Sequence, residues 1–203
     1  MNGALDSRRT ALLLVDLQND FLHPKGAYAR GGQSSKDISA LPARLAPLAR
    51  ELRTRGGSVI STHFTLVPDR HGEPLIGAHL RRLRPFLGRG DFAPGSFGHD
   101  LVDELKPADF RIEKVAYSAF YQTRLEFVLA RAGIDTLLVG GIVTNGGVAS
   151  TVRDAHVRDI RCIVLSDGCA AFRAEVHDAT LVSLGSIVTL ASIAEMRRAL
   201  EGA

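Results

Sequence analysis

Short apolar runs recur along the chain and are separated by longer amphipathic stretches. The first run, ALLLV at 11–15, is apolar at every position, as expected for a parallel strand that is buried on both faces. We expect strands at 11–15, 58–64, 110–115, 135–139, 161–165 and 186–190.

The stretches between these runs show helical spacing. In 38–55, Leu41, Leu45, Leu48 and Leu52 recur three or four residues apart, and Gly56 and Gly57 then end the pattern. Further helices are expected at 123–132, 146–157, 175–184 and 192–200. Residues 65–100 are rich in proline and glycine and form no clear element, which is typical of a functional lid or binding loop.

The alternation of strand and helix predicts an α/β fold with three layers (α/β/α). The sheet is expected to be mostly parallel and six-stranded, in a single domain over residues 1–203. In such folds the functional site lies at the carboxyl ends of the strands. The segments to inspect are therefore 16–20, 63–65, 114–120, 140–147 and 166–169.

Composition excludes several classes of protein. No apolar run reaches the roughly 18–20 residues that span a bilayer, and no signal peptide is expected at the N-terminus. A net charge of +3 without a basic, aromatic-interleaved stripe does not indicate nucleic-acid binding. The two cysteines, Cys162 and Cys169, make no disulfide framework, so a cytoplasmic protein is expected.

Two charged residues stand at the ends of predicted strands. Asp16 follows ALLLV, where partial desolvation would raise the pKa of its carboxyl and suit it to general acid or base catalysis. From position alone, a turn or capping role is as good an interpretation, and the nearby Asp20 is an alternative carboxylate. Lys114 ends FRIEK and is one of only four lysines among 25 basic residues, so it is a candidate for a chemical role because the pKa of a lysine can be tuned. Taken by itself, its position is better explained by a surface lysine at a strand end.

A glycine-rich turn, GGIVTNGG at 140–147, joins a predicted strand to a predicted helix. Glycines let a ligand approach the backbone, and a helix N-terminus suits an oxyanion or a carboxylate. The turn has neither the dinucleotide-binding fingerprint nor a P-loop. Glycine content alone would also be explained by a tight turn.

Together these segments resemble the isochorismatase-like (cysteine hydrolase) superfamily, which includes isochorismatase, nicotinamidase, N-carbamoylsarcosine amidase and ureidoacrylate amidohydrolase. The resemblance covers nearly the whole chain. It rests on DLQNDF at 16–21, PGS at 94–96, Lys114 with YSAF at 117–120, GIVTN at 141–145 with Thr151 and Asp154-Ala155, and SDGCA at 166–170.

The resemblance implies a catalytic triad of aspartate, lysine and cysteine. Asp16 and Lys114 match the first two, and the cysteine position falls on Gly147. It also implies a cis peptide at Val143-Thr144 and an oxyanion hole formed by that amide and the amide of residue 147. The substrate-binding residues that it implies are Phe21, His63, Tyr117, Phe120, Val143, Thr144, Asn145 and Gly146.

Glycine at position 147 removes the thiolate that amidases of this family use as nucleophile. Isochorismatases also carry glycine there and hydrolyse a vinyl ether, with the aspartate as proton donor to carbon. Because Thr144-Asn145 and DLQNDF are similar to the amidase branch, three interpretations stay open. The chain is expected to hydrolyse a small anionic metabolite by vinyl-ether chemistry; the alternatives are water-based amide or carbamate hydrolysis and a catalytically silent binding protein.

Further expectations concern metals, the cysteines, the loop arginines and the partners of the chain. Nicotinamidases bind a metal through Asp-x-His and a second histidine, a spacing that 61–65 and His71 do not reproduce, so neither a metal nor another cofactor is expected. Cys169 is expected to pack rather than react. One of the loop arginines, Arg81, Arg82, Arg84 and Arg89, is a candidate for binding a substrate carboxylate. The expected partners are a small-molecule substrate and further copies of the chain, in a homodimer or homotetramer.

Overall fold

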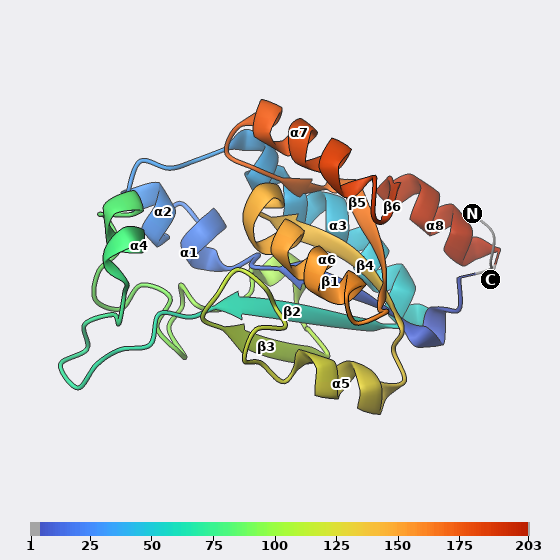
Figure 1. The fold of residues 1–203 in the computed structure, drawn as a ribbon, viewed down its shortest axis with the longest axis horizontal. Coiled ribbons are helices and arrows are strands. Elements are labelled where there is room, and N and C mark those ends of the chain that lie inside the picture. Colours follow the sequence, from blue (N-terminus) through green and yellow to red (C-terminus); the bar gives the residue numbers. More distant parts are fainter. Residues whose placement is uncertain (1–4, 203) are drawn as a thin grey trace.

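The computed structural model describes residues 5–202. Six parallel strands form one sheet in the order β3-β2-β1-β4-β5-β6 (Figure 1). Their bounds are β1 Thr10–Val15, β2 Ser58–Phe64, β3 Phe110–Lys114, β4 Thr136–Ile142, β5 Arg161–Ala170 and β6 Thr189–Ala191. The predicted parallel α/β sheet is confirmed. The central strands β1 and β4 are buried at every position, which explains their unbroken apolar sequence.

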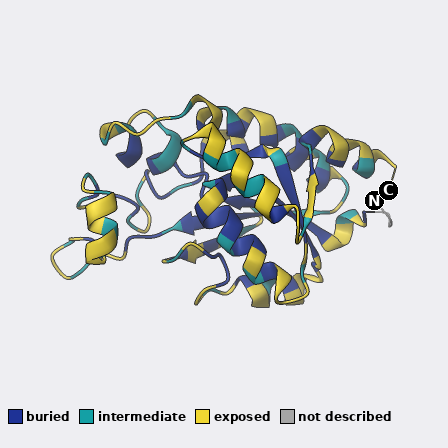
Figure 2. Ribbon diagram, turned by 45° about the horizontal axis from the view of Figure 1, so that its top comes forward, coloured by how far each residue is buried: buried dark blue, intermediate teal, exposed yellow. Residues whose placement is uncertain are grey.

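Helices cover both faces of this sheet, as the predicted three layers require (Figure 2). The buried side chains of α3 (Lys36–Thr54) and α8 (Ile193–Glu201) pack on one face. Those of α5 (Leu125–Ala132) and α6 (Ala149–His156), with the end of α7 (Ala174–Leu184), pack on the other. None of the described helices is long and apolar enough to cross a membrane.

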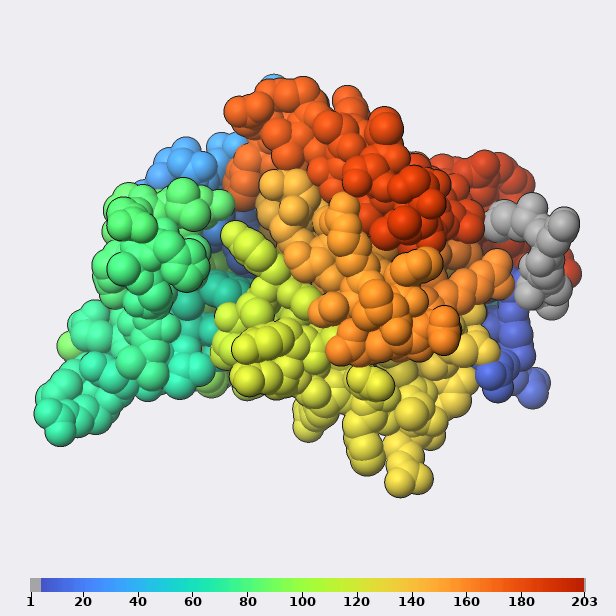
Figure 3. All heavy atoms as spheres, viewed as in Figure 1, coloured from blue at the N-terminus to red at the C-terminus, as the bar shows by residue number. Residues whose placement is uncertain are grey.

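Short elements gather at the carboxyl end of the sheet. They are α1 (Asn19–Leu22), α2 (Ala27–Arg30) and α4 (Ala78–Leu83), which lie at the end of the molecule opposite the chain termini (Figures 1 and 3). The remaining short elements are the 3₁₀ turns η1 (Ser7–Arg9) and η2 (Asp103–Leu105) and the π-helical turn η3 (Thr144–Val148). The loop predicted at 65–100 thus contains one helix, and α1 and α2 were not expected.

Two predicted boundaries were wrong near the site. The helix expected from 146 begins at Ala149, because 144–148 form the π-helical turn η3. Strand β5 does not end at 165, because a bulge in its pairing with β4 lets Gly141 pair with Cys169 and Ile142 with Ala170. Cys169 therefore lies inside β5 rather than beyond a strand.

Gly141 fixes the approach of β1 to β4 at the carboxyl edge. Its φ is 129°, and a Cβ atom there would lie 2.2 Å from the carbonyl oxygen of Val15. Only glycine tolerates this contact and this backbone conformation. The glycine thereby brings the turn after β4 against the end of β1, where Asp16 stands.

Candidate active site

Asp16 leaves the end of β1 with a positive φ of 57°, and the residue is only 5% exposed. Its backbone N–H donates to the Thr62 hydroxyl (3.1 Å), and that hydroxyl donates to Asp16 Oδ1 (2.7 Å). Aspartate is one of the few residues that adopt this left-handed conformation readily. Thr62, on the neighbouring strand β2, therefore fixes the orientation of the carboxylate.

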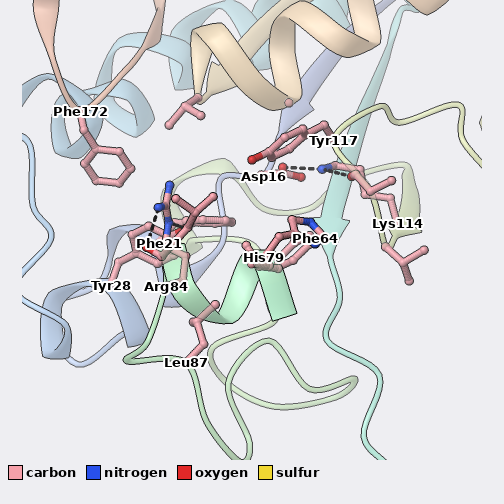
Figure 4. Close-up of a pocket in the computed structure, with 16 residues that line it drawn as sticks. Asp16, Phe21, Tyr28, Phe64, His79, Arg84, Leu87, Lys114, Tyr117 and Phe172 are labelled. Atoms are coloured by element: carbon pink, nitrogen blue, oxygen red, sulfur yellow. Dashed lines mark hydrogen bonds and ion pairs between the residues drawn. The ribbon is translucent and has the colours of Figure 1, made fainter. Parts of the chain in front are cut away.

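Lys114 ends β3, two strands away from β1, and its side chain crosses the end of β2. Its Nζ lies 2.6 Å from Asp16 Oδ2 and donates a second hydrogen bond to the Ala116 carbonyl (3.0 Å). The lysine is 2% exposed, and its ammonium lies 5.7 Å from the centroid of the Phe64 ring. The two side chains predicted to act together thus form a buried ion pair (Figure 4).

Burial changes the acid–base behaviour of this pair. Removal of the Asp16 carboxyl from water raises its pKa above the ordinary value, while the Lys114 ammonium and the Thr62 hydroxyl act in the opposite direction. The carboxyl therefore holds a proton at higher pH than an exposed aspartate does. Such a group can give a proton to a substrate and take one back.

The pair opens into a pocket of about 540 Å³ at the carboxyl end of the sheet (Figure 4). Aromatic and aliphatic side chains make up most of its wall. The lining residues are Asp16, Phe21, Tyr28, Phe64, His79, Leu80, Leu83, Arg84, Leu87, Lys114, Val115, Ala116, Tyr117, Val143, Gly147 and Phe172. None of these lining residues is a cysteine, serine or threonine.

Gly147 lines the pocket directly beside the carboxylate. A Cβ atom built there would lie 3.1 Å from Asp16 Oδ2, 3.1 Å from a methyl carbon of Val15 and 2.9 Å from the Ile142 carbonyl oxygen. A side chain at 147 would therefore project next to Asp16, as the resemblance predicts for the nucleophile position. The contact with the Ile142 carbonyl is closer than a Cβ atom tolerates, so the backbone as it stands fits glycine, and Gly147 lies directly against the Asp16 carboxylate.

Positive charge predominates in the pocket. Asp16 is the only carboxylate among the described lining residues, whereas Lys114 and Arg84 are both cations. Of the four candidate loop arginines only Arg84 lines the pocket. Arg89 instead pairs with Glu73 at 3.0 Å, and Arg81 and Arg82 are exposed on α4.

Six of the residues predicted from the sequence meet at this pocket, and five do not. Asp16, Lys114, Gly147, Phe21, Tyr117 and Val143 line it. His63, Phe120, Thr144, Asn145 and Gly146 lie outside its lining, so direct contact with substrate is not expected of them.

His63 and Phe120 are both buried in the interior. The His63 side chain bonds to Ser61 Oγ and to the His99 carbonyl oxygen, each at 2.8 Å. Phe120 belongs to the core under α5 and α6, with the Arg158 guanidinium 5.0 Å from its ring centroid. Both side chains are therefore used in packing rather than in the pocket.

The turn after β4 also differs in detail from the expectation. Thr144 is buried and its hydroxyl bonds to His177 Nδ1 (2.8 Å), while Asn145 is exposed and faces α7 instead of the pocket. Gly146 is buried behind Val143 and Tyr117, the nearest side chains to a Cβ built there. The cis peptide joins Ile142 to Val143, one residue earlier than predicted.

Asp20 and the cysteines have structural positions. Asp20 Oδ1 accepts the backbone N–H of Ala27 (2.9 Å) and Oδ2 that of Phe92 (2.6 Å), so Asp16 and not Asp20 is the carboxylate of the pocket. Cys169 donates to the Val139 carbonyl, and burial raises the pKa of its thiol to about 12. A thiol with that pKa is not a nucleophile at neutral pH.

Sequence reasoning missed part of the pocket wall. Tyr28 and Phe172 come from segments that carry no motif, and their rings stack 5.5 Å apart at an angle of 9°. Phe64, at the end of β2, could have been found from its position at a strand end. Among the described residues no group of three or more histidines, cysteines and acids is placed to hold a metal ion.

Comparison with known proteins gives matches that cover most of the chain. The isochorismatase domain model matches residues 10–195. A probable inactive nicotinamidase from Arabidopsis thaliana is 32% identical over 188 residues, which cover 89% of this chain and 90% of that protein. The ureidoacrylate amidohydrolase RutB of Methylorubrum extorquens (strain AM1) is 33% identical over 175 residues, 81% of this chain and 71% of the relative.

Solved structures show the same fold. A cysteine hydrolase from Pseudomonas syringae pv. phaseolicola 1448A superposes with a TM-score of 0.84 at 26% identity, covering 99% of this chain and 96% of that one. The N-carbamoylsarcosine amidase of Thermoplasma acidophilum gives a TM-score of 0.71 at 26% identity, over 91% and 96% of the two chains. With its paired Asp16 and Lys114, and with glycine at position 147, the chain belongs to the isochorismatase family of hydrolases.

Proposed function

We propose that this protein hydrolyses a small anionic metabolite by general acid–base catalysis, without a covalent intermediate. The observation that carries the proposal is the buried Asp16–Lys114 pair opening beside Gly147 into a pocket whose described lining has no cysteine, serine or threonine. A carboxyl with a raised pKa is suited to protonate the substrate. The excess of cations in the lining favours an anion.

Vinyl-ether hydrolysis of the isochorismate type is the most concrete form of this chemistry. Asp16 gives its proton to the terminal vinyl carbon, and the C=C electron pair forms the new C–H bond. The resulting oxocarbenium ion adds water at the carbon that bears oxygen. Loss of one proton from that water to Asp16 restores the acid, and collapse of the hemiketal with proton transfer to the departing oxygen yields a ketone and an alcohol.

Lys114 and the aromatic wall have separate parts in this scheme. While Asp16 holds its proton, the Lys114 ammonium leaves the pair with a net positive charge that attracts an anionic substrate. Once the proton is transferred, Lys114 stabilises the Asp16 carboxylate. Phe64 and Tyr117 line the same pocket, and the π-electrons of their rings can stabilise the cationic intermediate.

The test is release of pyruvate from isochorismate by the purified protein, followed with a coupled lactate dehydrogenase assay. We expect turnover by the wild type and a fall of about 100-fold or more in kcat for Asp16→Asn, because general acid catalysis contributes roughly 10²–10⁴. Asp159→Asn is the matched control, since Asp159 is exposed and has a similar positive φ (55°). Absence of pyruvate with the wild type would refute vinyl-ether hydrolysis of this substrate.

Water-based hydrolysis of an amide or carbamate is the second candidate. It is favoured by the similarity to amidohydrolases, one of which is named for ureidoacrylate. In this case Asp16 would take a proton from water, and ammonia would be released. Ammonia release from ureido acids or carboxamides that depends on Asp16 would support this candidate over the first. If neither reaction occurs across such a panel, a silent binding protein is the remaining interpretation.

A further inference from the structure

The pocket has a second polar end, formed by Arg84 and Tyr28, away from the Asp16–Lys114 pair (Figure 4). Arg84 follows α4 and is partly buried. Its Nε donates to the Tyr28 hydroxyl (3.1 Å) and its Nη1 to the Leu83 carbonyl (2.9 Å). Neither partner is a carboxylate, so these bonds orient the guanidinium without neutralising its charge.

Tyr28 is held firmly, which makes it a suitable support for Arg84. Its side chain is buried, stacks on Phe172 and meets the rings of Phe21 at 4.7 Å and Phe86 at 5.1 Å. The Arg84 guanidinium also lies 5.9 Å from the centroid of the Tyr28 ring. A guanidinium whose direction is set before binding loses less freedom when it forms a paired contact.

Apart from these polar groups the wall of the pocket is mostly apolar and rich in aromatic rings. Phe21, Phe64 and Tyr117 all line the pocket. Flat faces of this kind bind planar conjugated groups well. Nη2 takes part in neither hydrogen bond of Arg84, and Nη1 uses only one of its two N–H groups. A planar anion can therefore still bind the guanidinium through parallel N–H donors from Nη1 and Nη2.

We propose that Arg84, positioned by Tyr28, binds the carboxylate of a planar, unsaturated acid whose reacting bond then lies near Asp16. This inference names the substrate class of the same site and so rests on the proposed function. It assigns recognition and chemistry to opposite ends of the pocket. Arg84 is the residue that contacts substrate, and Tyr28 is a positioning residue.

Isothermal titration calorimetry with benzoate and benzamide as probes tests the assignment, because the two have nearly the same shape and only benzoate is charged. We expect the wild type to bind benzoate more tightly than benzamide. Arg84→Gln should weaken benzoate binding about 10- to 100-fold, the effect of losing a charge-assisted hydrogen bond, and leave benzamide binding unchanged. Arg84→Lys should recover only part of the loss, since an ammonium lacks the planar fork.

Two further variants separate the roles. Tyr28→Phe keeps the ring stack and removes the hydroxyl that orients Arg84, so it should weaken benzoate binding by a smaller factor and spare benzamide. Arg82→Gln, an exposed neighbour outside the pocket lining, is the control and should change neither affinity. Unchanged benzoate binding in Arg84→Gln, or equal affinity of the wild type for the two probes, would overturn the proposal.

The binding experiment is independent of turnover. Asp16→Asn should keep the preference for benzoate, because recognition takes place at the other end of the pocket. If the preference for benzoate depends on Arg84 but no isochorismate is hydrolysed, this inference stands and the vinyl-ether proposal fails. If isochorismate is hydrolysed and Arg84→Gln binds benzoate like the wild type, the reverse holds.

Discussion

Asp16 and Lys114 are each unfavourable as a single buried charge. Taking a carboxylate or an ammonium out of water costs several kcal/mol, and the partner charge offsets that cost only while both are present. Here the 2.6 Å contact, the Thr62 hydroxyl and the Ala116 carbonyl together satisfy most of the polar atoms of the pair. The stability of the fold is therefore coupled to the identity of both residues.

Removal of one member of this pair should cost more stability than removal of both. We expect Asp16→Asn to lower the free energy of unfolding by about 3–5 kcal/mol, because it leaves a buried ammonium without its counter-charge. The double variant Asp16→Asn/Lys114→Met should recover about 2 kcal/mol or more of that loss. Urea denaturation of the wild type, of Asp16→Asn, of Lys114→Met and of the double variant measures these free energies of unfolding. Strictly additive effects of the two single variants would contradict the coupling.

For single residues, the sequence predicted the charged pair of the site better than it predicted the residues that form the wall of the pocket. Asp16 and Lys114 are recognisable because each is a charged residue directly at a strand end. The prediction that His63 lines the pocket was wrong, although the alternation of side chains along a strand could have corrected it. Thr62 contacts Asp16 and Phe64 lines the pocket, whereas His63, between them on β2, is not among the lining residues. Arg84 and Tyr28 meet only through tertiary structure, and nothing in their local sequence indicates the contact.

The elements around the pocket are held together by Asp20. This buried side chain accepts the N–H of Ala27 at the start of α2 and that of Phe92, and its own N–H donates to the Gly98 carbonyl (2.8 Å). Gly98 must be glycine, because a Cβ there would lie 2.0 Å from Asp20 Oδ2. Through its carboxylate and its backbone N–H, Asp20 thus connects α1, α2 and the second half of the long loop.

Loss of the Asp20 carboxylate should loosen this loop while the sheet stays folded. Asp20→Ala leaves two buried amides without an acceptor, and we expect a loss of about 2–4 kcal/mol with faster hydrogen exchange in 86–100. Asp69→Ala is the matched control, because Asp69 also accepts two backbone amides but at an exposed turn where water replaces it. Equal effects of the two substitutions would show that burial of Asp20 is not what matters.

Long periodic elements were predictable and short ones were not. The helix α3 and the strand β2 agree with their predicted ranges to within two residues, because each has many positions that repeat one pattern. The helices α1, α2 and α4 have four to six residues each, too few for a periodic signal. The end of β5 depends on its pairing with β4 across a bulge, and this pairing cannot be predicted from the sequence of β5 alone.

At the scale of the whole molecule, two buried histidines, His63 and His99, affect how the stability of the fold depends on pH. His63 Nδ1 donates to the His99 carbonyl, since a carbonyl can only accept, and its Nε2 in the neutral ring accepts from the Ser61 hydroxyl. His99 Nε2 meets the Thr65 hydroxyl at 2.8 Å. Burial lowers the pKa of both imidazoles, that of His63 to about 4, with a further lowering from Arg111 and opposing effects of the His99 carbonyl and Asp100.

This arrangement predicts that acid destabilises the whole fold well above the pH at which most carboxylates are protonated. An unfolded chain binds a proton at His63 below about pH 6.5, whereas the folded chain does so only near pH 4. Between these values the unfolded state binds more protons, so the free energy of unfolding falls as the pH falls. The lowered pKa of His63 corresponds to a loss of about 3 kcal/mol in the free energy of unfolding, and this loss is complete once the pH is below the pKa of His63 in the folded state. Asp16 has the opposite effect on the free energy of unfolding at low pH, because its pKa is raised and the folded state binds this proton more readily than the unfolded state does.

Denaturation curves at a series of pH values from 7.5 to about 4 measure this slope, and His63→Asn isolates the contribution of one ring. The asparagine amide can still donate toward the His99 carbonyl but cannot be protonated, so the variant starts less stable and should lose less stability on acidification. The comparison of slopes is unaffected by that lower starting value. His99 should leave a residual slope in the variant, since the pKa of its ring is also lowered. Parallel curves for wild type and variant would mean that folding does not lower the pKa of the His63 imidazole, and the acid sensitivity would then have to come from other groups.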